Sequence, residues 1–345
     1  MWMTARVHAI LPLRPKRRAS KTAAVSRLLF LALLCATSIG MTRSEPLLQA
    51  RSESVSRIVA TPLLAEAQPG QSIGGLRYLS GHALTSADPR FGGISAMVRT
   101  RDGFTALSDS GIVMTLAGAN GRPSALRLKP LPAGPGDAAT KADRDSEAFA
   151  WDRGGRLWVV FERHNSVWRY TRGFGAAEVR RAPPAMKRWR ANSGAEAMVR
   201  LEDGRFLLFA EGAGSVPRSS DVLIFDRDPT DARACAARLS YRLPEGFSIT
   251  DAALLGDGRL ATLHRRISLR TGFAASVGVV PLSALRPGAV VAPRIIATLR
   301  SPFPVDNMEA LAVEQAGKRT LLWIASDDNF SGLQRTLLLK FELVE

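Results

Sequence analysis

The sequence has few residues of the kinds that build disulfide frameworks and zinc centres. It contains 2 cysteines and 4 histidines among 345 residues, and no cluster of them has the spacing of a zinc site. Once the N-terminal segment described below is removed, Cys235 is the one cysteine left, so an internal disulfide is excluded. A phosphate-cradling Gly-x-x-x-x-Gly-Lys-Ser/Thr loop is also absent, which excludes the P-loop class.

Aromatic residues are sparse as well. They make up 7% of the chain, whereas hydrophobic residues reach 46%, and glycine (29) and proline (20) are plentiful. This balance allows a packed core and is typical of many short strands joined by tight turns.

The positive charge is concentrated at the N-terminus. The formal net charge is +16, but residues 1–43 carry eight basic residues and no acid, which leaves +8 for the remainder. The remaining arginines alternate with acids and form no basic run interleaved with aromatics. Nucleic-acid binding is therefore not expected.

The chain has a short apolar segment rather than a membrane span. The stretch from Leu28 to Met41 is fourteen residues long, too short for a helix to cross a hydrocarbon core of about 30 Å. Its basic flank and the following Ser38-Ile39-Gly40 predict a signal peptide over 1–40 and a periplasmic or secreted protein that meets the membrane only through this segment. Residues 41–71 are polar and lack periodicity, so we predict a linker there and a domain over 72–345.

Five segments share one pattern: a polar residue, an alanine and then apolar residues. A glycine follows the polar residue by eight positions, or by seven in the fourth repeat, and an apolar strand after that glycine ends in a second polar residue. The first polar residues are Ser95, Glu147, Glu196, Asp251 and Glu309. The glycines are Gly103, Gly155, Gly204, Gly258 and Gly317. The second polar residues are Asp109, Glu162, Glu211, His264 and Asp327.

This pattern predicts five antiparallel hairpins that turn at the glycines and bring both polar residues to the end opposite the turn. The repeats lie about 50 residues apart, enough for a four-stranded blade. We therefore predict an all-β fold, a β-propeller of five or six blades, with an irregular sixth blade within 112–144 or 265–305. Leu76–Ser80 would be the N-terminal strand that closes the last blade. A β-solenoid or sandwich is the alternative.

Convergence of the hairpins would gather many carboxylates at one end of a central channel. Carboxylates this close repel one another unless some are protonated or a cation lies among them. Oxygen ligands favour a divalent cation such as Ca²⁺ over zinc. The predicted metal ligands are Glu147, Glu196, Asp251, Glu309 and Asp327, with Asp109 and Asp145 as further candidates. The competing interpretation is that these acids cap turns or pair with arginines.

Basic residues next to the acids predict an anionic small-molecule substrate such as a phosphate ester. Arg163 follows Glu162 and Arg265 follows His264, and we predict that these arginines bind phosphate. A metal ion would polarise the phosphoryl oxygen, and Glu162, Glu211 and His264 are the candidate catalytic acids and bases. We expect a monomer.

Several stretches resemble the bacterial exported proteins of the phytase-like family, "esterase-like activity of phytase". The resemblance spans roughly 74–343. It is carried by Phe91-Gly-Gly-Ile-Ser95 with Leu107-Ser-Asp109, Asp145-Ser-Glu-Ala-Phe-Ala150 with Glu162, Asn192-Ser-Gly-Ala-Glu196 with Glu211, Asp306-Asn-Met-Glu-Ala-Leu311, Ala325-Ser-Asp-Asp-Asn-Phe330 and Gln334-Arg-Thr336.

The resemblance implies a propeller and a phosphoesterase role, with the family's repeated acids falling on Glu147, Glu196, Glu309 and Asp327. Alanine follows each of these glutamates, where glycine is common in the family. Because one fold serves many functions, two alternatives stay open: a non-catalytic propeller that binds a ligand or partner around a structural ion, and a lactonase-like hydrolase.

Overall fold

The computed structural model describes residues 52–212, 214 and 216–345. The predicted signal peptide, residues 1–40, lies outside the described residues. In the described part, no helix is long and apolar enough to span a membrane. The regular elements there are β-strands and short 3₁₀ helices, namely η1 (Ala119–Gly121), η2 (Lys141–Asp143), η3 (Arg172–Phe174), η4 (Pro184–Arg188) and η5 (Leu282–Ala284).

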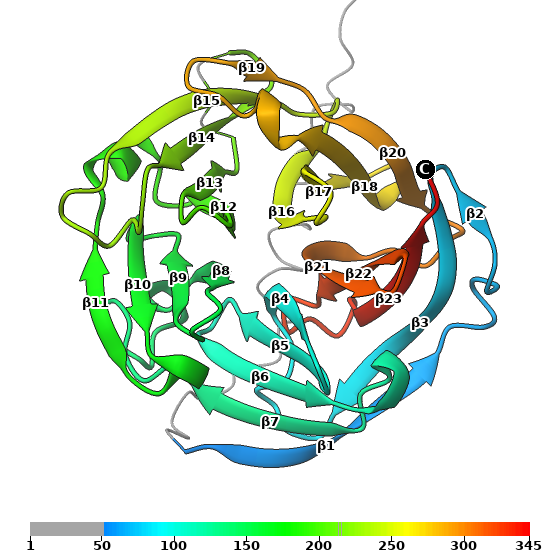
Figure 1. Cartoon of the computed structure of the whole chain (residues 1–345). Helices are drawn as coiled ribbons and strands as arrows, with labels where there is room; N and C mark the ends of the chain where they lie inside the picture. The colour runs from blue at the N-terminus through cyan, green and yellow to red at the C-terminus, as the bar shows by residue number, and fades with distance from the viewer. Residues whose placement is uncertain (1–51, 213, 215) are drawn as a thin grey trace, which may run out of the picture. The chain divides into compact units, whose positions relative to one another are not determined.

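The strands pair into five antiparallel blades, with the first strand of each hairpin innermost (Figure 1). Blade 1 comprises β4 (Ile94–Thr100), β5 (Gly103–Ser108), β6 (Ile112–Ala117) and β7 (Ala125–Pro130). Blade 2 comprises β8 (Ser146–Trp151), β9 (Leu157–Phe161), β10 (Ser166–Tyr170) and β11 (Ala177–Arg181). Blade 3 comprises β12 (Ala195–Arg200), β13 (Phe206–Ala210), β14 (Ser219–Phe225) and β15 (Ala236–Arg242), with β19 (Val290–Val291) parallel to β15.

Blade 4 comprises β16 (Ser248–Leu254), β17 (Arg259–Ser268), β18 (Gly272–Pro281) and β20 (Arg294–Arg300). Blade 5 comprises β21 (Asn307–Ala316), β22 (Arg319–Asp327), β23 (Thr336–Leu343) and, from the other end of the chain, β3 (Leu76–Ser86), which also pairs with β2 (Ser72–Ile73). The predicted β-propeller is thus confirmed, and its described blades are these five.

The N-terminal part of the domain closes the ring of blades. Strand β3 pairs antiparallel with β23, with Leu339 opposite Gly81, as predicted for 76–80. Strand β1 (Ser54–Pro62) then pairs with both β3 and β7, so that it joins blade 5 to blade 1 in one 10-stranded sheet. The predicted linker over 41–71 is therefore wrong for 54–62. These residues are polar because one face of an outermost strand is exposed to solvent.

The hydrophobic core consists of five clusters, one between each pair of neighbouring blades. Alternate side chains of a strand point to opposite faces of its sheet. In β9, Val159 and Phe161 pack toward blade 1, whereas Trp158 and Val160 pack toward blade 3. Strands in the middle of a blade are buried on both faces, which is why they appear in the sequence as continuous apolar runs.

A β-bulge marks the start of every inner strand. In four blades the bulged residue is the first polar residue of the repeat, namely Ser95, Glu147, Glu196 or Glu309. In blade 4 it is Thr250, because Ile249 pairs with His264 and Asp251 pairs with Leu263. Thr250 lies eight residues before Gly258, so the spacing of eight holds in all five repeats. Thr250, and not Asp251 as predicted from the sequence, therefore corresponds to the bulge glutamates.

The same shift affects the end of the hairpin. Ser248, two residues before the bulge, pairs with Arg265, just as Asn307, two residues before its bulge, pairs with Asp327. Arg265, and not His264, therefore occupies in blade 4 the position that an acid occupies in the other blades.

Closure by β3 predicts a large effect of a core substitution at the N-terminal end of the domain. Tyr78 is 1% exposed and its ring lies 5.2 Å from that of Phe303 and 5.7 Å from that of Phe341. Tyr78→Ala should lower the free energy of unfolding by about 3–5 kcal/mol because it leaves a cavity. Urea denaturation measures this, with the neighbouring Arg77→Ala as the control, since Arg77 is exposed and ion-paired only at the surface. Equal stability of the two variants would contradict closure by β3.

Candidate functional site

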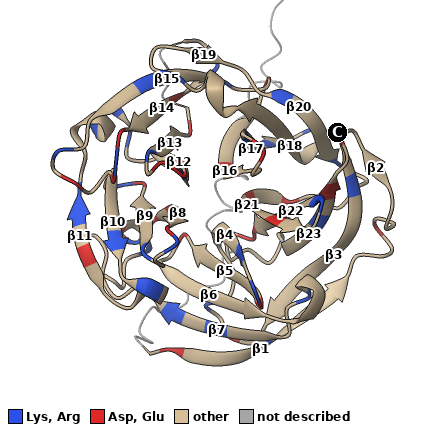
Figure 2. Cartoon of the chain, in the orientation of Figure 1, with Lys and Arg blue, Asp and Glu red and all other residues tan. Residues whose placement is uncertain are grey.

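The inner strands β4, β8, β12, β16 and β21 bring one end of every hairpin together. Acidic residues, red in Figure 2, occur on the ribbon near the centre of the ring, and the carboxylates at this end of the hairpins interact with one another. We call the carboxylates at this end the acidic ring. Their electrostatic interactions connect them across blades 1, 2, 3 and 5. The acidic ring consists of Asp109, Asp145, Glu147, Glu162, Glu196, Glu211, Glu309 and Asp327.

Burial makes negative charge costly in this ring. Burial, together with the charges of neighbouring carboxylates, raises the pKa of Glu147, Glu196 and Asp327 well above the usual range. Burial likewise raises the pKa of Glu162 and of Glu309 to about 7. Buried carboxylates that must ionise need a counter-charge close by.

Two protein cations supply part of that counter-charge. The Arg265 guanidinium lies 2.8 Å from Glu309 and 3.5 Å from Glu211, and it also donates to Asn307 Oδ1 at 2.8 Å. On the other side of the ring, Lys141 Nζ lies 2.7 Å from Asp109. Although burial opposes it, the charge of Asp109 raises the pKa of Lys141 to about 12, so its ammonium stays charged. These two cations are paired with acids of blades 1, 3 and 5, namely Asp109, Glu211 and Glu309.

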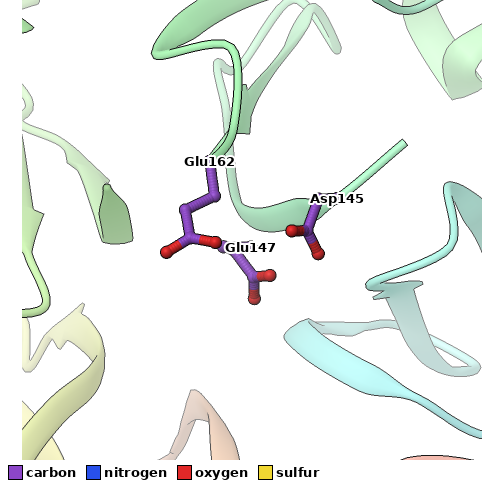
Figure 3. A group of neighbouring side chains, drawn as sticks. All are labelled: Asp145, Glu147 and Glu162. Atoms are coloured by element: carbon purple, nitrogen blue, oxygen red, sulfur yellow. The ribbon is translucent and has the colours of Figure 1, made fainter. Parts of the chain in front are cut away.

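The acids of blades 2 and 3 are left with much less compensation. Two groups of three carboxylates each bring one oxygen atom per residue within 4.8 Å of the others: Asp145, Glu147 and Glu162, and Glu162, Glu196 and Glu211. Figure 3 shows the first group gathered at the start of β8 and the end of β9. Glu162 belongs to both groups.

Two of these glutamates have no partner within the described residues. Neither Glu147 nor Glu196 makes a hydrogen bond or ion pair with any side chain or backbone group that the structure describes, although Glu196 is only 8% exposed. The other three are held in place: Asp145 lies 3.1 Å from Arg163 Nε, Glu162 accepts a hydrogen bond from the Gly194 amide at 3.1 Å, and Glu211 faces Arg265. Glu147 is half-buried. A glutamate that is largely buried and has no partner, as Glu196 is, is an observation that a bound cation would explain.

Glycine permits the close approach of blade 3 to Glu162. A Cβ atom at Gly194 would lie 2.8 Å from Glu162 Cγ, closer than real side chains pack. The glycine just before the Ala-Glu-Ala segment thus lets the blade 3 backbone donate to a carboxylate from blade 2. This contact orients Glu162 at the boundary between the two blades.

The predicted role of His264 is not supported. Its side chain is fully buried, with Nε2 2.9 Å from the Tyr241 hydroxyl and Nδ1 3.2 Å from the Ser276 carbonyl oxygen. Its ring stacks on Tyr241 between blades 3 and 4. Burial lowers the pKa of His264 to about 4. A neutral imidazole enclosed in this way cannot exchange protons with a substrate.

Asp251 also lies apart from the two carboxylate groups. Its carboxylate accepts hydrogen bonds from the Leu311 amide of blade 5 and from its own neighbour Ala252, both at 2.7 Å. It therefore joins the inner strands of blades 4 and 5. Thr250, which occupies the bulge, donates to the Met308 carbonyl of blade 5 at 3.1 Å, as Ser95 donates to Ser146 of blade 2 at 2.6 Å. These two bulge hydroxyls connect blades, and Glu309 does so through Arg265 of blade 4, whereas Glu147 and Glu196 at the equivalent positions make no such contact among the described residues.

The remaining predicted residues fall around the ring. Glu309 is paired with Arg265, Asp327 accepts a hydrogen bond from the Asn329 amide at 2.6 Å, and Arg163 is half-exposed at the rim. Lys141 was missed because it lies between repeats, where no pattern marks it. Of the predicted metal ligands, Glu147 and Glu196 lie in the carboxylate groups. The predicted acid/base residues Glu162 and Glu211 join them there.

One further motif proves to be structural. Gly70-Gln-Ser-Ile-Gly74 has the Gly-x-Ser-x-Gly spacing of a nucleophile elbow. A nucleophile elbow needs a sharp turn between a strand and a helix, whereas Ser72 is an exposed residue of β2 at the edge of blade 5. Its position gives no support to acyl-enzyme chemistry.

Two cavities have linings that contain no member of the acidic ring. A channel of about 210 Å³ runs between the inner strands and is lined by Met97, Phe149, Met198 and Leu311, with Asp251. A larger groove of about 910 Å³ lies at the far ends of the inner strands and is lined by Trp151, Arg153, Arg172 and Arg200. The carboxylate chemistry, and not the size of a cavity, identifies the candidate site.

Family resemblance agrees with this arrangement of repeated acids. A family model described as "Esterase-like activity of phytase" matches residues 89–330, from the loop before β4 to the loop after β22. The chain belongs to the phytase-like family. The match covers all five inner strands and every member of the acidic ring. No curated protein matches the sequence of this phytase-like chain.

Solved structures resemble the chain only distantly. A protein of unknown function from Dyadobacter fermentans is 11% identical and aligns over 78% of this chain and 99% of its own, with a TM-score of 0.47. A PQQ-bound aldose sugar dehydrogenase from Streptomyces coelicolor is 12% identical over 80% of this chain and 99% of its own, with a TM-score of 0.46. Virginiamycin B lyase from Staphylococcus aureus is 12% identical over 79% of this chain and 85% of its own, with a TM-score of 0.33. Similarities at this level have no bearing on the activity of the phytase-like chain.

The burial of His264 predicts a pH effect on stability. Between its folded pKa of about 4 and its ordinary value of about 6.5, the unfolded chain binds a proton that the folded chain does not. The stability that neutral His264 contributes is therefore full above pH 6.5 and is lost as the pH falls toward 4. At pH 5 the loss is about 2 kcal/mol.

His264→Asn removes this titration. Urea unfolding of both proteins at pH 7.5 and pH 5 measures it, and the acidic ring contributes equally to both. We expect the wild type to lose about 2 kcal/mol more than the variant between these pH values. Parallel losses would show that His264 is accessible to protons in the folded state.

Proposed function

We propose that this protein is a metal-dependent phosphoester hydrolase whose divalent cation, Ca²⁺, binds at the carboxylates of blades 2 and 3. The observation that carries the proposal is that Glu147 and Glu196 lie in the two carboxylate groups and have no hydrogen-bond or ion-pair partner among the described residues. Membership of the phytase-like family supports a phosphoester as the substrate. We further propose that the protein acts outside the cytoplasm, as its N-terminal 40 residues predict.

The donor set favours calcium. Asp145, Glu147, Glu162, Glu196 and Glu211 offer only carboxylate oxygens. Ca²⁺ accepts six to eight such oxygens in flexible geometry, whereas Mg²⁺ keeps several waters and uses one or two carboxylates. Zinc sites prefer histidine and cysteine, and neither residue belongs to a carboxylate group within the described part of the chain.

Hydrolysis adds water across the P–O ester bond and yields an alcohol and inorganic phosphate. A divalent cation at these carboxylates would withdraw electron density from a phosphoryl oxygen and lower the pKa of a coordinated water. The chain's own residues hold the reactants. Arg163 is the rim cation with its guanidinium half in solvent, so it can exchange part of its contact with Asp145 for a phosphate oxygen.

Arg265 has a different role from the one predicted by sequence. It is buried and already bound to Glu309, Asn307 and Glu211. It holds Glu211 of blade 3 and Glu309 of blade 5 in place, and it compensates the charge of Glu309, its closer partner. We therefore assign phosphate contact to Arg163 and a positioning role to Arg265.

Replacing a partnerless glutamate by its uncharged isostere tests the proposal. Glu196→Gln and Glu147→Gln should lower Ca²⁺-dependent phosphate release by about two orders of magnitude or more. In chelator both variants should melt at or above the Tm of the wild type, because each removes an acid that has neighbouring carboxylates and no partner among the described residues. Ca²⁺ at about 100 times Kd should stabilise the wild type by about 2.7 kcal/mol, several degrees in Tm, and the variants much less.

Phosphate release from p-nitrophenyl phosphate and from inositol phosphates measures activity, and thermal unfolding measures binding. Glu202→Gln is the matched control, because Glu202 is 84% exposed at the far end of the inner strands. A Tm rise with Ca²⁺ but no turnover of any phosphoester would leave a binding propeller with a structural ion. Lactone opening without phosphate release would indicate the lactonase alternative. Full activity in Glu196→Gln would refute the proposal.

A further inference from the structure

The carboxylates of blades 2 and 3 form two overlapping groups rather than one. Asp145, Glu147 and Glu162 make the first group entirely from blade 2 and the loop that leads into it. Glu162, Glu196 and Glu211 make the second group across the boundary between blades 2 and 3. Each group contains one glutamate without a partner among the described residues, Glu147 in the first and Glu196 in the second. Glu162 is shared.

We propose that the site binds two divalent cations, with Glu162 as the carboxylate that bridges them. This inference rests on the proposed metal site and defines its stoichiometry. The first cation is held by Asp145, Glu147 and Glu162, and the second by Glu162, Glu196 and Glu211. Paired cations that share a carboxylate are the arrangement by which many phosphoester hydrolases stabilise both the attacking and the leaving oxygen.

The charges of the two groups support two ions. The five carboxylates carry a formal charge of −5, and Arg163, paired with Asp145, offsets one of these charges. Arg265 is matched by its closer partner, Glu309, at 2.8 Å. Two divalent cations supply the remaining four charges. One divalent cation would leave two negative charges among carboxylates of which Glu162 and Glu196 are buried and the other three half-buried, and such charges are costly without a counter-ion.

The two partnerless glutamates point to the same conclusion. Glu196 is more than nine-tenths buried and lies beside Glu162 and Glu211, yet it accepts no hydrogen bond from any described group. The charge of Glu196 is also the largest electrostatic contribution from another residue to the raised pKa of Glu147. An ion placed in one group alone would leave the other partnerless glutamate uncompensated.

The backbone holds Glu162 where a bridging ligand must lie. Glu162 directly follows β9 of blade 2. Its Oε1 accepts a hydrogen bond from the Gly194 amide of blade 3 at 3.1 Å. The contact fixes the carboxylate between the two groups. Gly194→Ala would place a Cβ atom 2.8 Å from Glu162 Cγ and so displace the shared ligand without changing any charge.

Counting ions tests the inference without any measurement of activity. Isothermal titration of the chelator-treated full chain with Ca²⁺ should give two ions per chain. Asp145→Asn and Glu211→Gln should each keep one ion, because each variant weakens one group. Glu162→Gln should lose both high-affinity ions, and the exposed-surface control Glu202→Gln should keep two. Melting in chelator establishes that each variant is folded, since these changes remove charge and add no bulk.

Mn²⁺ used as a probe distinguishes a bridged pair from two separate ions. Electron paramagnetic resonance of the wild type with two equivalents of Mn²⁺ should show an exchange-coupled pair. Asp145→Asn should show the spectrum of an isolated ion, and Gly194→Ala should lose the coupling.

The outcomes separate this inference from the proposed function. One Ca²⁺ per wild-type chain, or two Mn²⁺ ions without coupling, overturns the bridged pair while the proposed hydrolase stands. Failure of Ca²⁺, Mg²⁺ and Mn²⁺ to bind at all overturns both. Two coupled ions without phosphoester turnover support the pair and reject the hydrolase.

Discussion

The face-to-face packing of five blades around a common axis is the constraint on which the rest of this protein depends. Each blade buries both of its faces against its neighbours, so the five apolar clusters leave no freedom for a blade to shift alone. The inner strands must then converge at their starts. Any side chain that a bulge directs toward the axis meets its counterparts from the other blades, and where these are glutamates their charges accumulate.

The repeats handle this accumulation in different ways. Blades 1 and 4 have hydroxyls at the bulge, Ser95 and Thr250, which bind the backbone of the next blade instead of adding charge. Blade 4 goes further by replacing the second acid of its hairpin with Arg265, which compensates Glu309. Blades 2, 3 and 5 keep both acids, but in blade 5 Glu309 is paired with Arg265. The departure from fivefold repetition therefore concentrates uncompensated charge on one side of the ring, where Glu147 and Glu196 have no partner in the part of the chain that the structure describes.

This asymmetry connects the fold with the function proposed for a member of the phytase-like family. A fully repeated ring of acids would describe the ancestry of the blades without locating a site. The loss of acids in blades 1 and 4, the neutralising contacts of Lys141 and Arg265, and the glycine that brings blade 3 against Glu162 single out one region. Compensation of clustered negative charge stabilises the folded state. A cation would therefore be bound most strongly in the region whose carboxylates lack such compensation.

The sequence by itself determined the propeller, because the turn glycines, the Glu-Ala segments and the apolar strands recur with one spacing, and residues near 76–80 are the extra strand that the last blade needs. It also determined that Glu147, Glu162, Glu196 and Glu211 lie at one end of the hairpins, since antiparallel pairing follows from distance to the turn.

Only the tertiary structure decided the register of blade 4, because a bulge moves a residue to the other face without changing composition. Asp251 and Thr250, or His264 and Arg265, are thus indistinguishable without the backbone pairing. The structure alone likewise showed which carboxylates are neutralised. Lys141 lies in the short 3₁₀ helix η2 between two repeats, and contacts between blades join residues far apart in the chain.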